Sequence, residues 1–96
     1  MGNYKDMMAF IESLSRKCKP FLIIKYETTF CGSSNTAYEI VTICSKKLRY
    51  MSIERSLALD AIRKFGLPLL HSLSNRNMVW GSENFREVYH EKKCSL

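Results

Sequence analysis

The side chains able to do covalent or acid–base chemistry are few and widely spaced. His71 and His90 are the two histidines, and the four cysteines form no C-x-x-C pair. A pair such as Cys31 or Cys44 with His71 would supply a nucleophile and its base only if folding brought the two together. Neither histidine has another histidine at metal-ligand spacing. The sequence therefore predicts a non-enzymatic protein with no catalytic residue, no cofactor and no metal.

Phosphate binding is the chemistry that the basic residues favour. Two basic runs lie far apart in the sequence, and a tyrosine follows the second run. Lysine and arginine neutralise phosphates, and a neighbouring tyrosine can stack on a base. The candidate nucleic-acid-binding residues are Arg16, Lys17, Lys19, Lys46, Lys47, Arg49 and Tyr50. The alternative interpretation is a solvated charged rim, which hairpin ends often carry.

A β-hairpin between the two basic runs would bring them together. Residues 21–30 are rich in β-branched and aromatic side chains, and residues 36–45 read as a second strand. A four-residue loop at 32–35 predicts that Tyr26 pairs with Val41. Because the start of one antiparallel strand lies beside the end of the other, the six charges are expected to converge at one end of the sheet.

The same register predicts which face of the hairpin forms the core. The predicted core face consists of Leu22, Ile24, Tyr26, Phe30, Ala37, Val41 and Ile43. The other face, which includes Tyr38 and Ile40, is mixed in character and is expected to be partly exposed.

Two amphipathic helices are predicted to pack on the apolar face. The first covers residues 3–18 and ends before Pro20, which disfavours helical backbone in the residue that precedes it. The second covers residues 53–65, with Ser52 as its N-cap and Gly66 just beyond its end.

A protein–protein interaction module, such as an adaptor, an inhibitor or a homodimer, is the alternative function. Leu59 lies off the buried stripe of the second helix, one turn from both Arg55 and Arg63. Arginine is enriched at protein interfaces, although scattered exposed leucines are also normal. The outward side of the second strand, around Tyr38 and Ile40, is a second candidate interface.

The C-terminal third predicts a second hairpin and a short helix. Residues 69–73 and 78–80 flank the turn-forming segment 74–77. At helical spacing in residues 82–92, Phe85, Val88 and Tyr89 share a face, although the segment also alternates acceptably as a strand. The fold class predicted for residues 1–96 is a single α+β domain with an antiparallel sheet of three or four strands.

Composition sets the remaining expectations. The chain has 96 residues, of which 46% are hydrophobic and 25% charged, as in an ordinary globular domain. Its net charge of +6 suits an anionic partner such as nucleic acid, but also serves solubility. No leader peptide is recognised, and no apolar run reaches the roughly 20 residues that cross a bilayer. A cytoplasmic protein is expected, with reduced cysteines packed as small apolar side chains.

Overall fold

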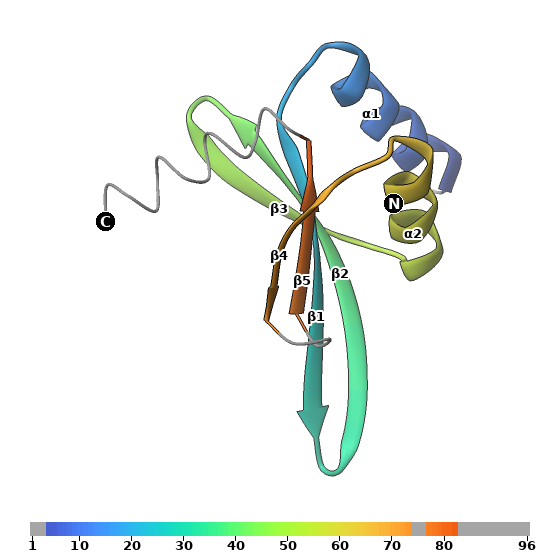
Figure 1. Ribbon diagram of the computed structural model, residues 1–96, viewed down its shortest axis with the longest axis vertical. Helices are drawn as coiled ribbons and strands as arrows, with labels where there is room; N and C mark the ends of the chain where they lie inside the picture. Colours follow the sequence, from blue (N-terminus) through green and yellow to red (C-terminus); the bar gives the residue numbers. More distant parts are fainter. Residues whose placement is uncertain (1–3, 74–76, 83–96) are drawn as a thin grey trace.

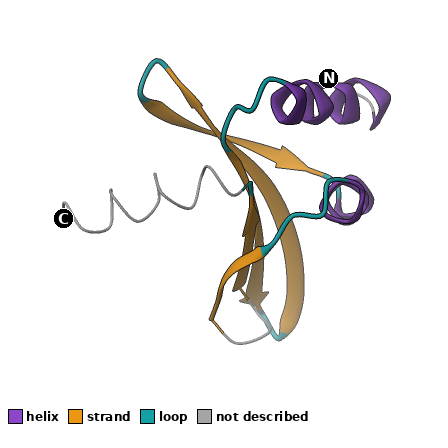
Figure 2. Cartoon of the chain, turned by 45° about the horizontal axis from the view of Figure 1, so that its top comes forward, coloured by secondary structure: helices purple, strands orange, loops and turns teal. Residues whose placement is uncertain are grey.

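The computed structural model describes residues 4–73 and 77–82 (Figure 1). Its elements are α1 (Tyr4–Arg16), β1 (Phe21–Phe30), β2 (Ser33–Cys44), β3 (Lys47–Ile53), α2 (Arg55–Lys64), β4 (Leu69–Leu73) and β5 (Asn77–Gly81). The strands form one sheet in the order β3-β2-β1-β5-β4, and every pairing is antiparallel. Both helices lie on the same side of this sheet (Figure 2). The predicted α+β class is confirmed, but the sheet has five strands rather than three or four.

The first hairpin turns more tightly than predicted. Only Cys31 and Gly32 separate the strands, and their φ angles of 51° and 81° are both positive. A two-residue type I′ turn requires positive φ at both central positions, and its twist matches that of the flanking strands. Leu22 rather than Tyr26 therefore pairs with Val41. The predicted four-residue loop and its register are wrong.

A second two-residue turn creates a strand that was not predicted. Ser45 and Lys46 have φ angles of 52° and 66°, and the chain returns as β3 alongside β2. Ser52, predicted to cap the second helix, instead lies within β3. Glu54 occupies the N-cap position, with no hydrogen bond from its side chain, and α2 begins at Arg55. The predicted helix 53–65 is therefore shortened at its N-terminus.

The two helices are joined by contacts along their length. The Tyr4 hydroxyl donates a hydrogen bond to Asp60 Oδ2, which raises the pKa of Tyr4 above its ordinary value. At the other end of α1, Lys64 Nζ lies 3.5 Å from Glu12 Oε2. The predicted first helix, residues 3–18, ends earlier at Arg16.

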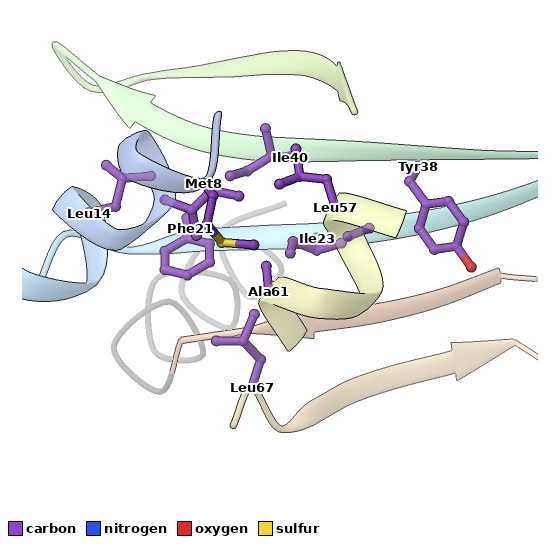
Figure 3. Packing of buried hydrophobic residues seen from close by; sticks show 11 residues of the cluster. Met8, Leu14, Phe21, Ile23, Tyr38, Ile40, Leu57, Ala61 and Leu67 are labelled. Carbon is purple, nitrogen blue, oxygen red and sulfur yellow. The ribbon is translucent and has the colours of Figure 1, made fainter. Parts of the chain in front are cut away.

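The main core lies between the helices and one face of the sheet (Figure 3). Its buried members are Met8, Ile11, Leu14, Phe21, Ile23, Tyr38, Ile40, Leu57, Ala58, Ala61 and Leu67. Directly paired residues of an antiparallel sheet share a face, and successive residues alternate. The helices therefore cover the face of Tyr38 and Ile40, which was predicted to be partly exposed.

The face predicted to receive the helices is the opposite one. A separate apolar cluster lies there, with Leu22 and Val41 buried. Ile24, Ile43, Leu48, Leu70 and Val79 are partly buried around them. We call this surface the open face, because neither α1 nor α2 packs on it (Figure 2). The alternating pattern of the strands is consistent with helices on either face, because both faces carry apolar residues. The prediction placed the helices on the wrong one.

The second hairpin is confirmed, with β4 paired to β5 and a register irregularity between Leu69 and His71. β5 also pairs with β1, so the hairpin extends the sheet beyond β1. After β5, Ser82 Oγ accepts a hydrogen bond from Phe21 N at 3.2 Å. The remainder of the predicted helix 82–92 lies outside the described residues.

Candidate nucleic-acid interface

Two connections that carry the basic runs lie at the same end of the sheet. β1 begins at Phe21, which pairs with Thr42, and Thr42 pairs in turn with Arg49. The α1–β1 connection and the β2–β3 turn therefore leave the sheet in the same direction, as Figures 1 and 2 both show. We call the following residues the basic end: Arg16, Lys17, Lys19, Lys46, Lys47 and Arg49.

The end of α1 is shaped by its backbone hydrogen bonds. Cys18 adopts a positive φ of 54°, and Lys19 N donates to Leu14 O at 2.9 Å. A left-handed residue of this kind stops a helix and satisfies its last carbonyl groups. Lys17 and Lys19 are both exposed where the chain turns toward β1. The helix ending thus presents the first basic run to solvent.

Most of these charges are unpaired within the described part of the chain. Arg16 Nη2 lies 3.5 Å from Glu12 Oε1, but Glu12 also faces Lys64. The other five cations of the basic end are exposed and form no ion pair with any residue among 4–73 and 77–82. Exposed pairs such as Arg16–Glu12 contribute at most about 1 kcal/mol. Within residues 4–73 and 77–82, five cations therefore have no acidic partner.

Tyr50 lies on a different face from its basic neighbours. Because side chains alternate along β3, Lys47 and Arg49 point toward the helix side, whereas Tyr50 points toward the open face. Tyr50 is 57% exposed and is paired with Val41 of the open-face cluster. The sheet therefore separates Tyr50 from the predicted phosphate-contacting side chains of β3.

The position of Lys46 carries a conformational cost. Its φ of 66° lies in the left-handed region, where side chains with a Cβ are disfavoured by roughly 1 kcal/mol. Glycine is the preferred residue at the second position of a type I′ turn, and Gly32 fills that position in the other hairpin. The sequence thus retains a lysine where glycine would relieve strain.

The two parts of the candidate protein interface differ in their exposure. Tyr38 and Ile40 are buried beneath the helices, at 5% and 0% exposure, so they present no surface to a partner. On α2, Leu59 is half-buried while Arg55 and Arg63 are exposed. The helix part of that alternative stays a prediction, and the strand part is wrong.

The candidate cysteine–histidine pairs are not brought together. Cys44 ends β2 and His71 lies in β4, so three strand spacings, roughly 14 Å, separate the two strands. Cys31 lies at the tip of the first hairpin, beyond the part of β1 that pairs with β5. His90 lies outside the described residues. Cys18, Cys31 and Cys44 are exposed, so the expectation that they pack as apolar side chains is wrong for these three.

A hollow of about 340 Å³ adjoins the basic end and was not anticipated. It lies where the ends of α1 and α2 approach the start of β1, and Lys19 is the charged residue in its wall. The other lining residues are Ser15, Cys18, Phe21, Phe65, Gly66, Leu67, Pro68 and Ser82. No sequence pattern joins these segments, because they meet only through tertiary packing.

On the open face, Tyr26 provides a titratable probe. Partial burial, followed by the charge and hydrogen bond of Glu39, raises the pKa of the Tyr26 phenol above its ordinary 10.0. A raised folded-state pKa means that this group stabilises the fold fully below about pH 10, and that the contribution is lost as pH rises through the folded-state pKa. We expect Glu39→Gln to lower the Tyr26 pKa, measured by phenolate absorbance with Tyr26→Phe as the subtraction control. An unchanged titration curve would contradict the contact.

The comparisons with known proteins add no family to this description. No protein family, curated protein sequence or solved structure shows significant similarity to the chain. Within the described residues, no helix is long and apolar enough to cross a membrane. The same residues contain no group of three histidine, cysteine or acidic side chains arranged to hold a metal ion.

Proposed function

We propose that the protein binds nucleic acid through its basic end, as a binding module without a chemical step. The observation that carries the proposal is the position, at one end of the sheet, of five exposed cations from two distant segments that form no ion pair with the described residues. Such a surface contacts phosphates rather than base edges. The expected affinity is therefore strongly salt-dependent and largely independent of sequence.

The strained turn at Lys46 supports this proposal. A residue in a sparsely populated backbone conformation persists when the surrounding structure or a function maintains it. Lysine at the tip of the β2–β3 turn projects a charge beyond the sheet, which glycine cannot do. The proposal places the protein in the cytoplasm, where the thiols of Cys18, Cys31 and Cys44 stay reduced.

Replacing Lys46 by glycine is expected to separate binding from stability. Lys46→Gly should raise the free energy of unfolding by about 0.5–1 kcal/mol, since glycine adopts positive φ without steric cost. The same change should weaken nucleic-acid binding about tenfold through loss of one charged contact. Denaturant unfolding and fluorescence anisotropy measure the two effects on the same protein samples.

Cys31→Asn in the other hairpin turn is the matched control. Asparagine tolerates positive φ and is favoured at the first position of a type I′ turn, so this variant should gain stability without losing affinity. If Lys46→Gly keeps full affinity while becoming more stable, the lysine has no binding role. Titrations against single- and double-stranded DNA and RNA of equal length then show which form binds most tightly.

A further inference from the structure

The hollow beside the basic end has the size and lining of a small-ligand site. Its volume is about 340 Å³, and ligand pockets begin at roughly 300 Å³, so a ligand of one or two rings suits it. Its walls combine the buried side chains of Phe21 and Leu67 with the exposed residues Ser15 and Lys19. Apolar walls with a few polar groups are typical of sites that take a flat ligand with polar edges.

Phe65 supplies an aromatic wall that is held in place. Its side chain is half-buried against the main core, and Lys64 Nζ lies 5.6 Å from the centroid of its ring. The same residue lines the hollow. Aromatic side chains beside a basic surface stack on the bases of single-stranded nucleic acids, with little dependence on base type. A duplex keeps its bases paired and stacked, so it offers no base to Phe65 unless one is flipped out.

The charges around the hollow separate the place of a base from that of its phosphates. The hollow lies at the C-terminal ends of both α1 and α2, where the helix dipole places partial negative charge. A phosphate is therefore disfavoured inside the hollow, whereas an uncharged base is not. Lys19 in its wall and the nearby Lys17 are exposed, and neither forms an ion pair with a described residue. The phosphates on either side of an inserted base would meet these two lysines.

We propose that the hollow receives one unpaired base of a single-stranded nucleic acid, which stacks on Phe65 while Lys17 and Lys19 contact the adjoining phosphates. The inference rests on the proposed nucleic-acid binding and adds to it a preference for single strands. β1 and β3 lie two strand spacings apart, roughly 10 Å. About three nucleotides span that distance at about 3.4 Å per nucleotide, so the same strand can continue from the hollow to the β2–β3 turn.

Replacing Phe65 by leucine removes the aromatic ring and keeps an apolar side chain against the core. We expect Phe65→Leu to weaken the binding of a labelled single strand about tenfold in fluorescence anisotropy. Duplex affinity and the salt dependence of both forms should not change, because no phosphate contact is lost. Phe65→Tyr keeps the ring and should bind as the wild-type protein does. Phe30→Leu is the matched control, since Phe30 is 74% exposed at the far end of the first hairpin.

The outcomes distinguish this inference from the proposed function. A wild-type protein that binds neither single nor double strands would overturn both. Salt-dependent binding of both forms by the wild-type protein, with no effect of Phe65→Leu on the single strand, would overturn the base site alone. An equal loss of affinity for both forms in Phe65→Leu would do the same, because the substitution would then act on the basic end as a whole.

Thiol protection in the wild-type protein is the second measurement, and it stands even if Phe65→Leu fails to fold. Cys18 lines the hollow, whereas Cys31 lies at the tip of the first hairpin, and both are exposed. A saturating single strand should slow the alkylation of Cys18 several-fold and leave Cys31 unchanged, as measured by mass spectrometry of the peptides. A saturating duplex should protect Cys18 much less. Equal protection of Cys18 by both forms, or none by the single strand, would contradict the inference.

Discussion

Reversing the charges of Lys46 and Lys47 is expected to reduce the affinity for nucleic acid about 100-fold at low salt. Each lysine is exposed and forms no ion pair with the described residues, so its charge is free to meet a phosphate. A hydrogen bond to a charged group contributes about 1.5 kcal/mol or more, and each 1.4 kcal/mol is tenfold in affinity. The double variant Lys46→Glu, Lys47→Glu should therefore lose two such contacts and add repulsion.

The control for this variant changes net charge equally at a distant site. Lys5 and Arg55 are exposed at the N-terminal ends of α1 and α2, remote from the β2–β3 turn. Glutamate near a helix N-terminus is compatible with the helix dipole, so Lys5→Glu, Arg55→Glu should fold normally. We expect only a small loss of affinity for this pair, measured by anisotropy in the same buffer. Equal losses in both double variants would show that total charge, and not the basic end, determines binding.

Truncating Ile40 to alanine is expected to destabilise the protein by about 3–4 kcal/mol. Ile40 is 0% exposed and belongs to the core beneath the two helices, so alanine leaves a cavity that neighbouring side chains fill only partly. For a domain whose total stability is about 5–15 kcal/mol, that loss is large. Chemical denaturation followed by circular dichroism measures it.

Ile24→Ala on the open face is the matched substitution. Ile24 is half-buried, so its truncation should cost about 1–2 kcal/mol. The comparison tests which face of the sheet the helices cover. A larger loss for Ile24→Ala than for Ile40→Ala would mean that the helices pack on the face of Leu22 and Val41 instead.

Much of the strand pattern was predictable from residue types. The first strand was predicted with its observed bounds, Phe21–Phe30, because the segment is rich in β-branched and aromatic residues. The register was not predictable in the same way. It depends on whether Cys31 adopts positive φ, and cysteine gives little local signal for that conformation. Asparagine at this position would have marked the tight turn.

The strand β3 was not predicted, and the physical reason is a different one. The segment Lys47–Ile53 alternates between polar and apolar residues only as far as Tyr50, because Met51 breaks the pattern, and Ser52 and Glu54 together match a helix start. The tight turn at Ser45 and Lys46 returns the chain along β2, so the segment forms a strand and not the start of a helix. Because that turn lacks glycine and asparagine, its sequence does not indicate a hairpin.

The face of the sheet that the helices cover could not be predicted, for a more general reason. Alternation puts Leu22 and Val41 on one side and Ile23 and Ile40 on the other, and both sets are strongly apolar. Which set meets the helices depends on how the connections cross the sheet ends, and that is a tertiary property. The predicted position of the two basic runs depends less on the register of the hairpin, because the start of β1 and the end of β2 stay adjacent in any register.

The salt dependence of nucleic-acid affinity tests the central proposal most directly. Dissociation constants for a labelled duplex, measured between 50 and 200 mM salt, give the slope of log K against log salt concentration. Five phosphate contacts predict a slope of about −4.5 for the wild-type protein, and three contacts predict a slope of about −2.7 for Lys46→Glu, Lys47→Glu. A wild-type slope near zero, or the same slope in both proteins, would contradict phosphate binding by the basic end.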